Sequence, residues 1–430
     1  MRLLAFLLPI ACRPSPSAIV ETDPPGSLVD ADSDVDSDSD TEPDGPSEPD
    51  PAARCAAFVT AAPKVVALEV REGFPSGAPD VEIAYGGHAA ILYGHRVEGA
   101  LATWVHGRDA PFTAGLGLLV RTGGLAAETG GWSALIDAPD GGTRLYRAGL
   151  DGTFSGGELV VNYEGAEPPT FASDGSGIWA ALLRHKGDDG HVWIVESGGI
   201  PAPVGPASSE PGSAAVAVGG GVHAMWWADE PMQSVLRYRA PDRTVQDAVV
   251  TPASVAKGSV RMDTVDGRPV ALLSVGDGLD ALTQAADGTF AATRLDTVDD
   301  PGVSACPAAT PEATTPCDLD YTELVPFGVR GDAGLALFAW GRVHTVRSFD
   351  LACRGPEEYR WCEWVPSGPA ERTGTAWVGC FDPAWRAVQV SSDLPAVDGS
   401  LALRDDTFVL AAYADTGRAF DLRVLRVDLP

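Results

Sequence analysis

The sequence predicts an all-β fold, and within that class a seven-bladed β-propeller. A short apolar strand pattern recurs seven times, at 87–93, 131–137, 177–183, 221–227, 268–274, 334–340 and 407–413. In the first five copies the fourth residue is alanine, and the spacings are 44, 46, 44 and 47 residues: Ala90, Ala134, Ala180, Ala224 and Ala271. A fixed period in the forties, built on apolar strands, is typical of a propeller with one repeat per blade.

Each copy is followed, after a polar turn, by a second apolar stretch, as the next strand of a blade would be. These stretches lie at 100–105, 144–148, 191–195, 234–238, 279–283, 343–347 and 421–425. The tetrapeptide D-G-T-F occurs at 151–154 and 287–290, and Asp-Gly predicts a tight hairpin turn because glycine accepts a positive φ. We expect the small residue at position four to face the channel or a neighbouring blade. A solenoid or a pair of β-sandwiches is the alternative architecture.

Residues 1–12 have the layout of an export signal. Arg2 precedes the apolar run Leu3–Ile10, and the small Ala11 stands before Cys12. This layout resembles a bacterial lipoprotein signal, which implies cleavage after residue 11 and a diacylglycerol on Cys12. Because Arg13 is not aspartate, the resemblance favours the outer membrane over the inner membrane. Pro9 departs from the usual leucine and the run is short, so an ordinary cleaved signal or a misplaced start codon is the alternative.

Residues 12–54 predict a lipid-anchored, disordered acidic linker. This region is rich in Pro, Ser, Asp and Glu and contains D-A-D-S-D-V-D-S-D-S-D at 30–40. Few apolar residues and mutually repelling carboxylates cannot offset the entropy of ordering the chain. Calcium binding is not favoured, because neither possible register places glycine at position six and glutamate at position twelve of an EF-hand loop. Only one helix is expected, in the alanine-rich stretch 51–62.

The formal net charge is −30. The linker carries twelve acids, so the folded region is acidic as well. Such a surface repels phosphate backbones, which argues against nucleic-acid binding. We therefore expect a monomer whose only contact with the membrane is the lipid anchor.

The cysteines predict three disulfides. Setting Cys12 aside leaves an even number in an exported protein: Cys55, Cys306, Cys317, Cys353, Cys362 and Cys380. No C-x-x-C pair and no histidine at zinc-finger spacing supports a metal site. Fifteen pairings are possible, and the economical one joins Cys306 to Cys317, Cys353 to Cys362 and Cys55 to Cys380.

The repeat spacing supports this pairing. After Ala271 the equivalent positions are Leu337 and Leu410, so the last two intervals are 66 and 73 residues. Each enlarged interval contains one close cysteine pair, which predicts a propeller over 55–430 with stapled insertions near 296–321 and 350–372. Placing Cys380 in the last blade, we expect the bridge to Cys55 to tie the two ends of the ring together.

At this level of detail the chain resembles the TolB-type and WD-like periplasmic propellers. The resemblance is carried by L-Y-R-A-G-L-D-G-T-F at 145–154 and A-S-D-G-S-G-I-W-A-A at 172–181, and it extends over most of 60–430. It concerns architecture only. No G-H…W-D signature is present, and the offsets around Asp174 do not match the Asp-box of sialidase-like propellers. Because propellers host enzymes, scaffolds and binding modules alike, this resemblance implies no activity.

The sequence contains no catalytic motif. No G-x-S-x-G occurs, and no pair of acids is singled out for glycoside hydrolysis. A metal site would require histidines such as His88, His95 and His106, or His185 and His191, to converge with acids such as Glu82 or Asp109. Scattered strand histidines are the simpler interpretation, so no metal and no cofactor are expected.

Aromatic residues provide the candidate binding site. Trp226 and Trp227 lie in a predicted core strand and are interpreted as packing. Tyr359, Trp361 and Trp364 lie in the stapled insertion, away from the regular blade pattern, where they could contact a ligand or form a satellite cluster under the loop.

Two functions of different class remain. The favoured one is a binding or scaffolding module of the bacterial cell envelope that holds a protein or carbohydrate ligand at its blade-end loops. The alternative is an exported carbohydrate-active hydrolase, which would require at least two carboxylates converging at the channel mouth, one with a raised pKa.

Overall fold

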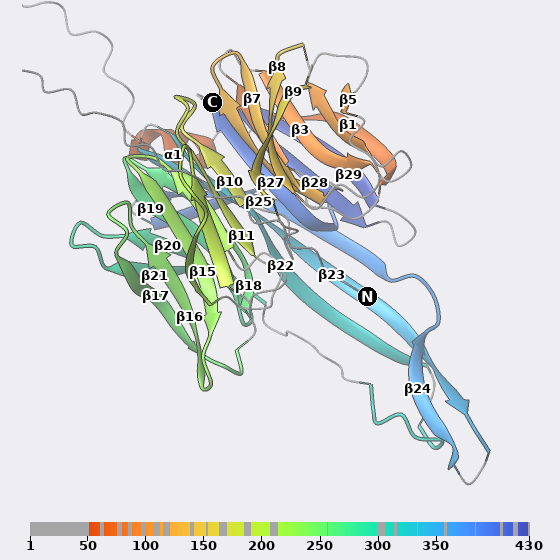
Figure 1. Ribbon diagram of the computed structural model, residues 1–430. Helices are drawn as coiled ribbons and strands as arrows, with labels where there is room; N and C mark the ends of the chain where they lie inside the picture. The colour runs from red at the N-terminus through yellow and green to blue at the C-terminus, as the bar shows by residue number, and fades with distance from the viewer. Residues whose placement is uncertain are drawn as a thin grey trace, which may run out of the picture. The chain divides into compact units, whose positions relative to one another are not determined.

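The computed structural model (Figure 1) is built from antiparallel sheets and a single helix within the part of the chain that it describes. It describes residues 51–428 except 61–63, 75–79, 85–87, 96–99, 106–111, 115–120, 138–141, 152–153, 163–169, 185–190, 207–213, 256, 299–305, 314–315, 333, 357–358, 383, 405–406 and 416–419. The predicted signal peptide, Cys12 and nearly all of the predicted linker lie outside the described residues. Helix α1 (Pro51–Thr60) begins four residues before the predicted start of the folded region. No described helix is long and apolar enough to cross a membrane.

The described strands form seven sheets, numbered here in chain order. Sheet 1 contains β2 (Asp80–Ala84), β3 (His88–His95), β4 (Ala100–Val105) and β5 (Phe112–Ala114). Sheet 2 contains β6 (Arg121–Glu128), β7 (Gly131–Asp137), β8 (Thr143–Gly149) and β9 (Phe154–Val161). Sheet 3 contains β10 (Thr170–Ser173), β11 (Trp179–Arg184), β12 (His191–Glu196) and β13 (Ala202–Pro206). Sheet 4 contains β14 (Ala214–Val218), β15 (Val222–Asp229), β16 (Gln233–Arg239) and β17 (Val245–Pro252).

The remaining sheets depart from this simple order. Sheet 5 contains β18 (Lys257–Val265), β19 (Arg268–Val275), β20 (Gly278–Gln284) and β21 (Phe290–Thr297). Sheet 6 contains β22 (Cys317–Asp332), β23 (Leu335–Arg354), β25 (Glu371–Asp382) and β26 (Ala384–Ser391), with β24 (Trp361–Pro366) added along β23. Sheet 7 contains β27 (Ala396–Arg404), β28 (Thr407–Asp415) and β29 (Phe420–Asp428), and it is completed by β1 (Lys64–Phe74) from the start of the chain.

The sequence repeat corresponds to the second strand of every sheet. All seven copies fall on β3, β7, β11, β15, β19, β23 and β28. The repeated alanines are fully buried, and they pack in the apolar clusters between neighbouring sheets rather than along the channel. A residue without a long side chain is needed there because the sheets approach closely at that level.

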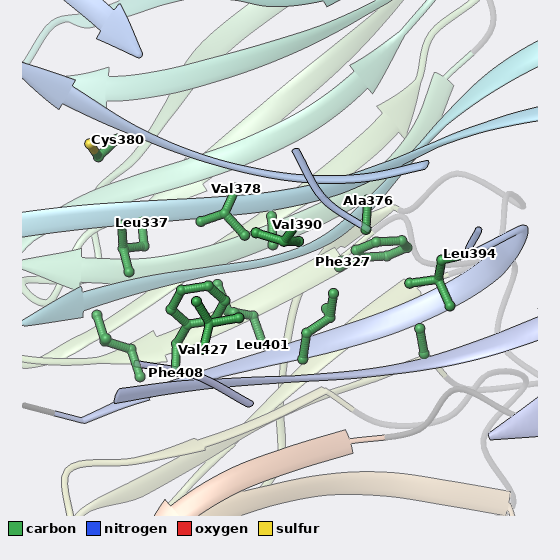
Figure 2. Close-up of a cluster of buried hydrophobic side chains, with 14 of the residues drawn as sticks. Phe327, Leu337, Ala376, Val378, Cys380, Val390, Leu394, Leu401, Phe408 and Val427 are labelled. Atoms are coloured by element: carbon green, nitrogen blue, oxygen red, sulfur yellow. The ribbon is translucent and has the colours of Figure 1, made fainter. Parts of the chain in front are cut away.

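Apolar clusters join the sheets in chain order and then join sheet 7 back to sheet 1. Figure 2 shows the cluster between sheets 6 and 7, where Leu337 and Val378 point toward Leu401 and Phe408. Trp226 and Trp227 are completely buried, as predicted. The all-β propeller class is therefore confirmed, and the blade count stays a prediction with which the seven sheets agree.

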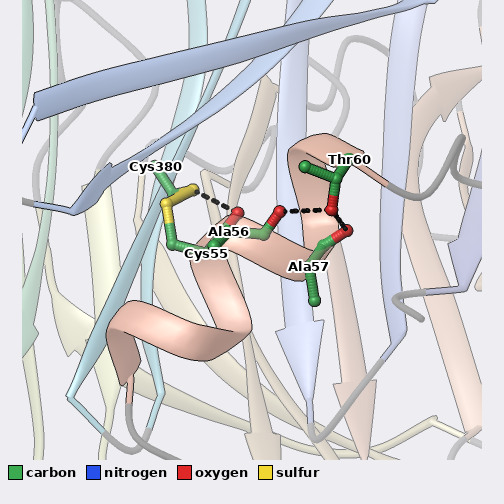
Figure 3. Close-up of a disulfide and its surroundings, with 5 residues drawn as sticks. All are labelled: Cys55, Ala56, Ala57, Thr60 and Cys380. Atoms are coloured by element: carbon green, nitrogen blue, oxygen red, sulfur yellow. Dashed lines mark hydrogen bonds between the residues drawn. A yellow bond between two sulfur atoms is a disulfide. The ribbon is translucent and has the colours of Figure 1, made fainter.

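The chain closes on itself in two ways. β1 pairs with β29, so residues from both ends of the folded region share sheet 7. A disulfide joins Cys55 of α1 to Cys380 of β25 (Figure 3). The pairing of these cysteines is as predicted, but the placement of Cys380 in the last blade was wrong, because β25 belongs to sheet 6. The bridge thus fastens α1 to the sheet that precedes the closing one.

Two further expectations concern sheets 6 and 5: the first was wrong and the second is confirmed. The stretch 343–347 was predicted as a separate strand, yet it continues β23, and the third strand of this sheet is β25. No turn forms because Gly341 is an extended, buried residue packed against the ring of Phe327. The D-G-T-F turn at 287–290 is confirmed: Gly288 has φ +87° and the Asp287 carboxylate accepts hydrogen bonds from the Thr289 N–H and hydroxyl.

Candidate functional site

Two regions of the propeller gather polar or aromatic side chains. The first is the channel, where the first strands of the sheets surround a cavity of about 620 Å³. Strands β6, β10 and β14 contribute small and apolar residues such as Ala126, Ala172 and Val216 to its wall. Strands β18, β22, β27 and β2 contribute all the charged lining residues except Asp174, so one part of the wall is mainly apolar and the other is ionic.

Arg330 of β22 and Glu82 of β2 form an ion pair inside this channel, with Nη2 3.3 Å from Oε2. Both side chains are largely buried. Their strands are separated by β27 in the order of the sheets, so the pair bridges sheets 6 and 1, which are not neighbours. The interaction therefore links distant parts of the channel wall.

Asp80 links three sheets through its two carboxylate oxygens. Oδ2 accepts a hydrogen bond from the Leu125 N–H of β6, and Oδ1 accepts from the Ser400 hydroxyl of β27 at 2.7 Å. Oδ1 also accepts from the Val81 N–H. The Leu125 N–H of sheet 2 thus has a side-chain acceptor from sheet 1, and buried polar groups need such a hydrogen-bond partner.

Asp263 and Arg261 of β18 also link sheets through their side chains. Asp263 Oδ2 accepts a hydrogen bond from the Gly331 N–H of β22 at 3.0 Å. Arg261 donates to the Phe327 carbonyl of β22 and lies 3.0 Å from Asp398 of β27. These contacts extend the network across sheets 5, 6 and 7.

The charges in this network are unevenly balanced. Asp398 forms an ion pair with Arg261, which also attracts Asp80, whereas Glu82, Asp80 and Asp263 share Arg330. Loss of hydration raises the pKa of Glu82 to about 7, because this effect and repulsion by the two aspartates outweigh the attraction of Arg330. Burial also raises the pKa of Asp80 and of Asp263. Desolvation opposes the charge on Arg330, but attraction by the three carboxylates raises its pKa.

The carboxylates converge as a hydrolase would require, but their oxygens are already in use. Each oxygen of Asp80, Glu82 and Asp263 accepts at least one hydrogen bond or ion pair from the protein. The network therefore primarily joins the sheets. The sequence contains a pattern that could have predicted this network. Charged and apolar residues alternate just before a repeat in D-V-E-I-A at 80–84 and in R-M-D at 261–263.

The second region is the hairpin formed by the end of β23 and β24, called the arm (349–366). Both insertions contribute to this part of the molecule, since β22 pairs with β23 as far as Cys317 and Phe349, and β24 pairs with β23 from there to Arg354. Figure 1 shows β24 beside the far end of β23. Cys353 and Cys362 are directly opposite in the register and form a disulfide, as predicted.

The other short disulfide, Cys306–Cys317, is also as predicted. It fastens the segment before β22 at the arm. The Trp364 indole N–H donates to the Pro307 carbonyl at 2.7 Å, so this segment lies against the arm at a second point.

The structure separates the three predicted aromatic residues. Trp361 and Trp364 are three residues apart on one strand and therefore point to opposite faces. Trp364 is half-buried and holds Pro307, whereas Tyr359 and Trp361 are 78% and 51% exposed. The guanidinium of Arg354, the register partner of Trp361, lies 5.5 Å from the centre of its ring and 3.3 Å from Glu363. A role for Tyr359, Trp361 and Trp364 in ligand binding stays a prediction.

No cluster of three or more histidine, cysteine or acidic side chains that could hold a metal occurs among the described residues. The side chains of His88, His95, His106, His185 and Asp109 lie outside the described residues. His191 is half-buried on β12.

No protein-family model matches the chain, and no curated protein matches its sequence. Among solved structures, the PQQ-bound aldose sugar dehydrogenase of Streptomyces coelicolor is 11% identical with a TM-score of 0.37, over 86% of this chain and 99% of that one. The six-bladed fucose-recognising lectin of Aleuria aurantia is 10% identical with a TM-score of 0.36, over 70% and 88%. YCF48 of Cyanidioschyzon merolae is 10% identical with a TM-score of 0.41, over 84% and 98%. The seven sheets and the apolar clusters between them define the chain as a β-propeller protein, and likenesses this remote carry no argument.

Proposed function

We propose that this protein is a lipid-anchored module of the bacterial cell envelope that binds a protein or carbohydrate ligand through its arm. The observation that supports the proposal best is the exposure of Tyr359 and Trp361 on a hairpin closed by the Cys353–Cys362 disulfide. Tyrosine and tryptophan are enriched at interfaces, because each side chain offers a large apolar surface and one hydrogen-bonding group. They also dominate the energetics of many interfaces.

The surroundings of Trp361 suit recognition. Arg354 covers one side of the indole ring and is itself held by Glu363, so the ring loses little rotational freedom when a ligand binds. The hairpin also supplies charged hydrogen-bonding groups beside the aromatic surface. A rigid aromatic platform with adjacent polar groups can stack on a sugar ring or fill a pocket of a partner protein.

A binding assay with envelope material tests this proposal. Purified protein is sedimented with insoluble cell-wall polysaccharides and with envelope fractions, and the bound fraction of the wild type is compared with that of Tyr359→Ala and Trp361→Ala. Loss of a central aromatic contact lowers affinity roughly tenfold or more. Phe381→Ala is the matched control, because Phe381 is an aromatic residue of β25 that is 49% exposed and lies away from the arm. Equal binding by wild type and both arm variants would contradict the proposal.

The predicted anchor has its own test. Cys12→Ser should move the expressed protein from the membrane fraction to the soluble fraction of lysed cells, and it should abolish incorporation of a labelled fatty acid. Fatty-acid labelling that persists in this variant would rule out Cys12 as the lipidated residue.

A second candidate function is favoured by one observation in the channel. Glu82, with a pKa of about 7, lines the same cavity as Asp80 and Asp263, and glycoside hydrolysis requires an acid of raised pKa together with a second carboxylate. A hydrolase of this kind would release sugars from aryl glycosides or polysaccharides, and Glu82→Gln would abolish the release. Absence of hydrolysis across a broad substrate panel would leave binding as the function.

A further inference from the structure

A second cavity, called here the root pocket, lies where the arm leaves sheet 6. Its volume is about 480 Å³. On β23, Phe338 and Trp340 are buried against sheet 5, and the next two side chains on that face are Arg342 and His344, which line the pocket. The root pocket thus forms where the interface between sheets 5 and 6 ends.

Hydroxyl groups form much of the lining. They belong to Thr322, Thr373, Thr375 and Ser392. The strand register places Thr322, His344 and Thr373 directly opposite one another on β22, β23 and β25. Residues in such positions have Cβ atoms roughly 5 Å apart, so a hydroxyl, an imidazole and a second hydroxyl form a row across the sheet.

Arg342 and His344 of the root pocket are held by neighbouring groups. Arg342 Nη2 donates to Asp296 Oδ1 at 2.6 Å and to the Thr297 carbonyl at 2.8 Å. The His344 ring lies 3.3 Å from the Thr322 hydroxyl through Nδ1 and 3.5 Å from Asp320 through Nε2. Several hydroxyl groups beside an imidazole, with the guanidinium already paired, suit a neutral ligand rich in hydroxyl groups better than a phosphate or an amine.

We propose that the root pocket binds a sugar unit of a carbohydrate ligand, with the row Thr322, His344 and Thr373 forming hydrogen bonds to its hydroxyl groups. This inference rests on the proposed binding function and deepens it, because it selects carbohydrate over protein. Arg354, which supports Trp361, lies ten residues beyond His344 on the same face of β23 (354 minus 344), or about 34 Å along the strand. A carbohydrate chain is therefore a ligand that could contact both the root pocket and the arm.

Calorimetric titration of the full chain tests the proposal. The probes are soluble oligosaccharides of glucose, xylose, mannose and N-acetylglucosamine that are long enough to reach from the root pocket to the arm, together with soluble peptidoglycan fragments. Thr373→Val and Thr322→Val each remove a hydroxyl while keeping the side-chain shape, and each should weaken binding of the recognised probe roughly fivefold. Thr293→Val on the exposed part of β21 is the matched control and should bind like the wild type.

The outcomes separate this inference from the proposed function. Weakening by both root-pocket variants but not by Thr293→Val supports the inference. If Trp361→Ala weakens binding while both root-pocket variants bind like the control, the root pocket is not a sugar site, although the arm still binds. If no carbohydrate probe binds at about 10 mM, or only a protein from the envelope fractions binds, the choice of carbohydrate is overturned.

Discussion

At the scale of single residues, the channel network combines strong hydrogen bonding with an unfavourable charge balance. Asp80, Glu82 and Asp263 connect sheets, yet they share the Arg330 guanidinium for charge compensation, and Arg261 adds attraction to Asp80. A buried carboxylate without full compensation is stabilised by taking up a proton. The network is therefore a part of the protein whose stability should respond to pH.

We predict that the propeller loses stability as the pH rises from about 4.5 to about 7. The pKa of Glu82 is raised from 4.5 to about 7 by folding, so below pH 4.5 the group is protonated in both the folded and unfolded states. Between these values only the unfolded state ionises readily, which lowers the free energy of unfolding by about 3 kcal/mol in total. Asp80 and Asp263 shift in the same direction and add to the loss. Thermal unfolding across this range measures the effect.

Glu82→Gln provides the decisive comparison, since an amide keeps the shape of the side chain but does not ionise. Its melting temperature should change less with pH than that of the wild type, whereas Asp247→Asn, at a side chain that is 58% exposed, should leave the wild-type slope unchanged. A slope in Glu82→Gln equal to that of the wild type would show that another group controls the pH response.

Arg330→Met should make the melting temperature depend more strongly on pH than that of the wild type. It removes the cation shared by three buried carboxylates, and breaking a buried ion pair from one side typically costs 3–5 kcal/mol. The loss should be larger at pH 8 than at pH 5, because protonation relieves the repulsion at low pH. A melting temperature within about 2 °C of the wild type at pH 8 would contradict a central role for Arg330.

At the scale of elements, the arm illustrates what the sequence could and could not predict. The two close cysteine pairs predicted their short disulfides correctly, and that these disulfides close insertions into the repeat stays a prediction. That both insertions meet at the same place, through pairing of β22, β23 and β24, depends on long-range strand register. The sequence did not predict that β23 continues unbroken for twenty residues, for the same reason. Glycine is typical of turns, and only the packing of Gly341 against Phe327 shows that it lies within a strand.

The arm should depend on its disulfide far more than the sheets do. Among the described residues of the arm, none is buried, and an isolated two-stranded hairpin is marginal in water. Replacing Cys353 and Cys362 with serine removes about 2.5–3 kcal/mol of loop constraint in the chain-entropy model. We expect faster hydrogen exchange and proteolysis within 349–366, with the main melting transition shifted by less than about 2 °C. A large fall in that transition would mean that the arm and the sheets unfold as one unit.

At the scale of the whole molecule, the period in the forties was enough to place a strand in every sheet, because each repeat must bury the same face against its neighbour. The ionic half of the channel was not predicted, since first strands from sheets far apart in sequence bring those charges together. The closure by β1 was also missed, because this strand precedes the first complete repeat and has no partner in its own part of the chain.

The ring of sheets is closed by the Cys55–Cys380 disulfide and by the pairing of β1 with β29. Cys55 and Cys380 are 325 residues apart, so their bridge restrains the unfolded chain by about 5–6 kcal/mol in the chain-entropy model. Replacing Cys55 with serine and Cys380 with alanine should therefore lower the main melting transition by several degrees, in contrast to the arm variant, because sheets 6 and 7 and α1 share one apolar cluster around this bridge. Pairing of β1 with β29 should still close the ring, so the variant should remain a monomer in light scattering.

Deleting residues 1–74 should instead expose the edge of β29 and cause association, because unpaired edge strands recruit other chains. Association of the cysteine variant would show that β1 alone does not keep the ring closed. A monomeric deletion variant, which lacks Cys55 as well as β1, would show that neither the disulfide nor β1 is needed.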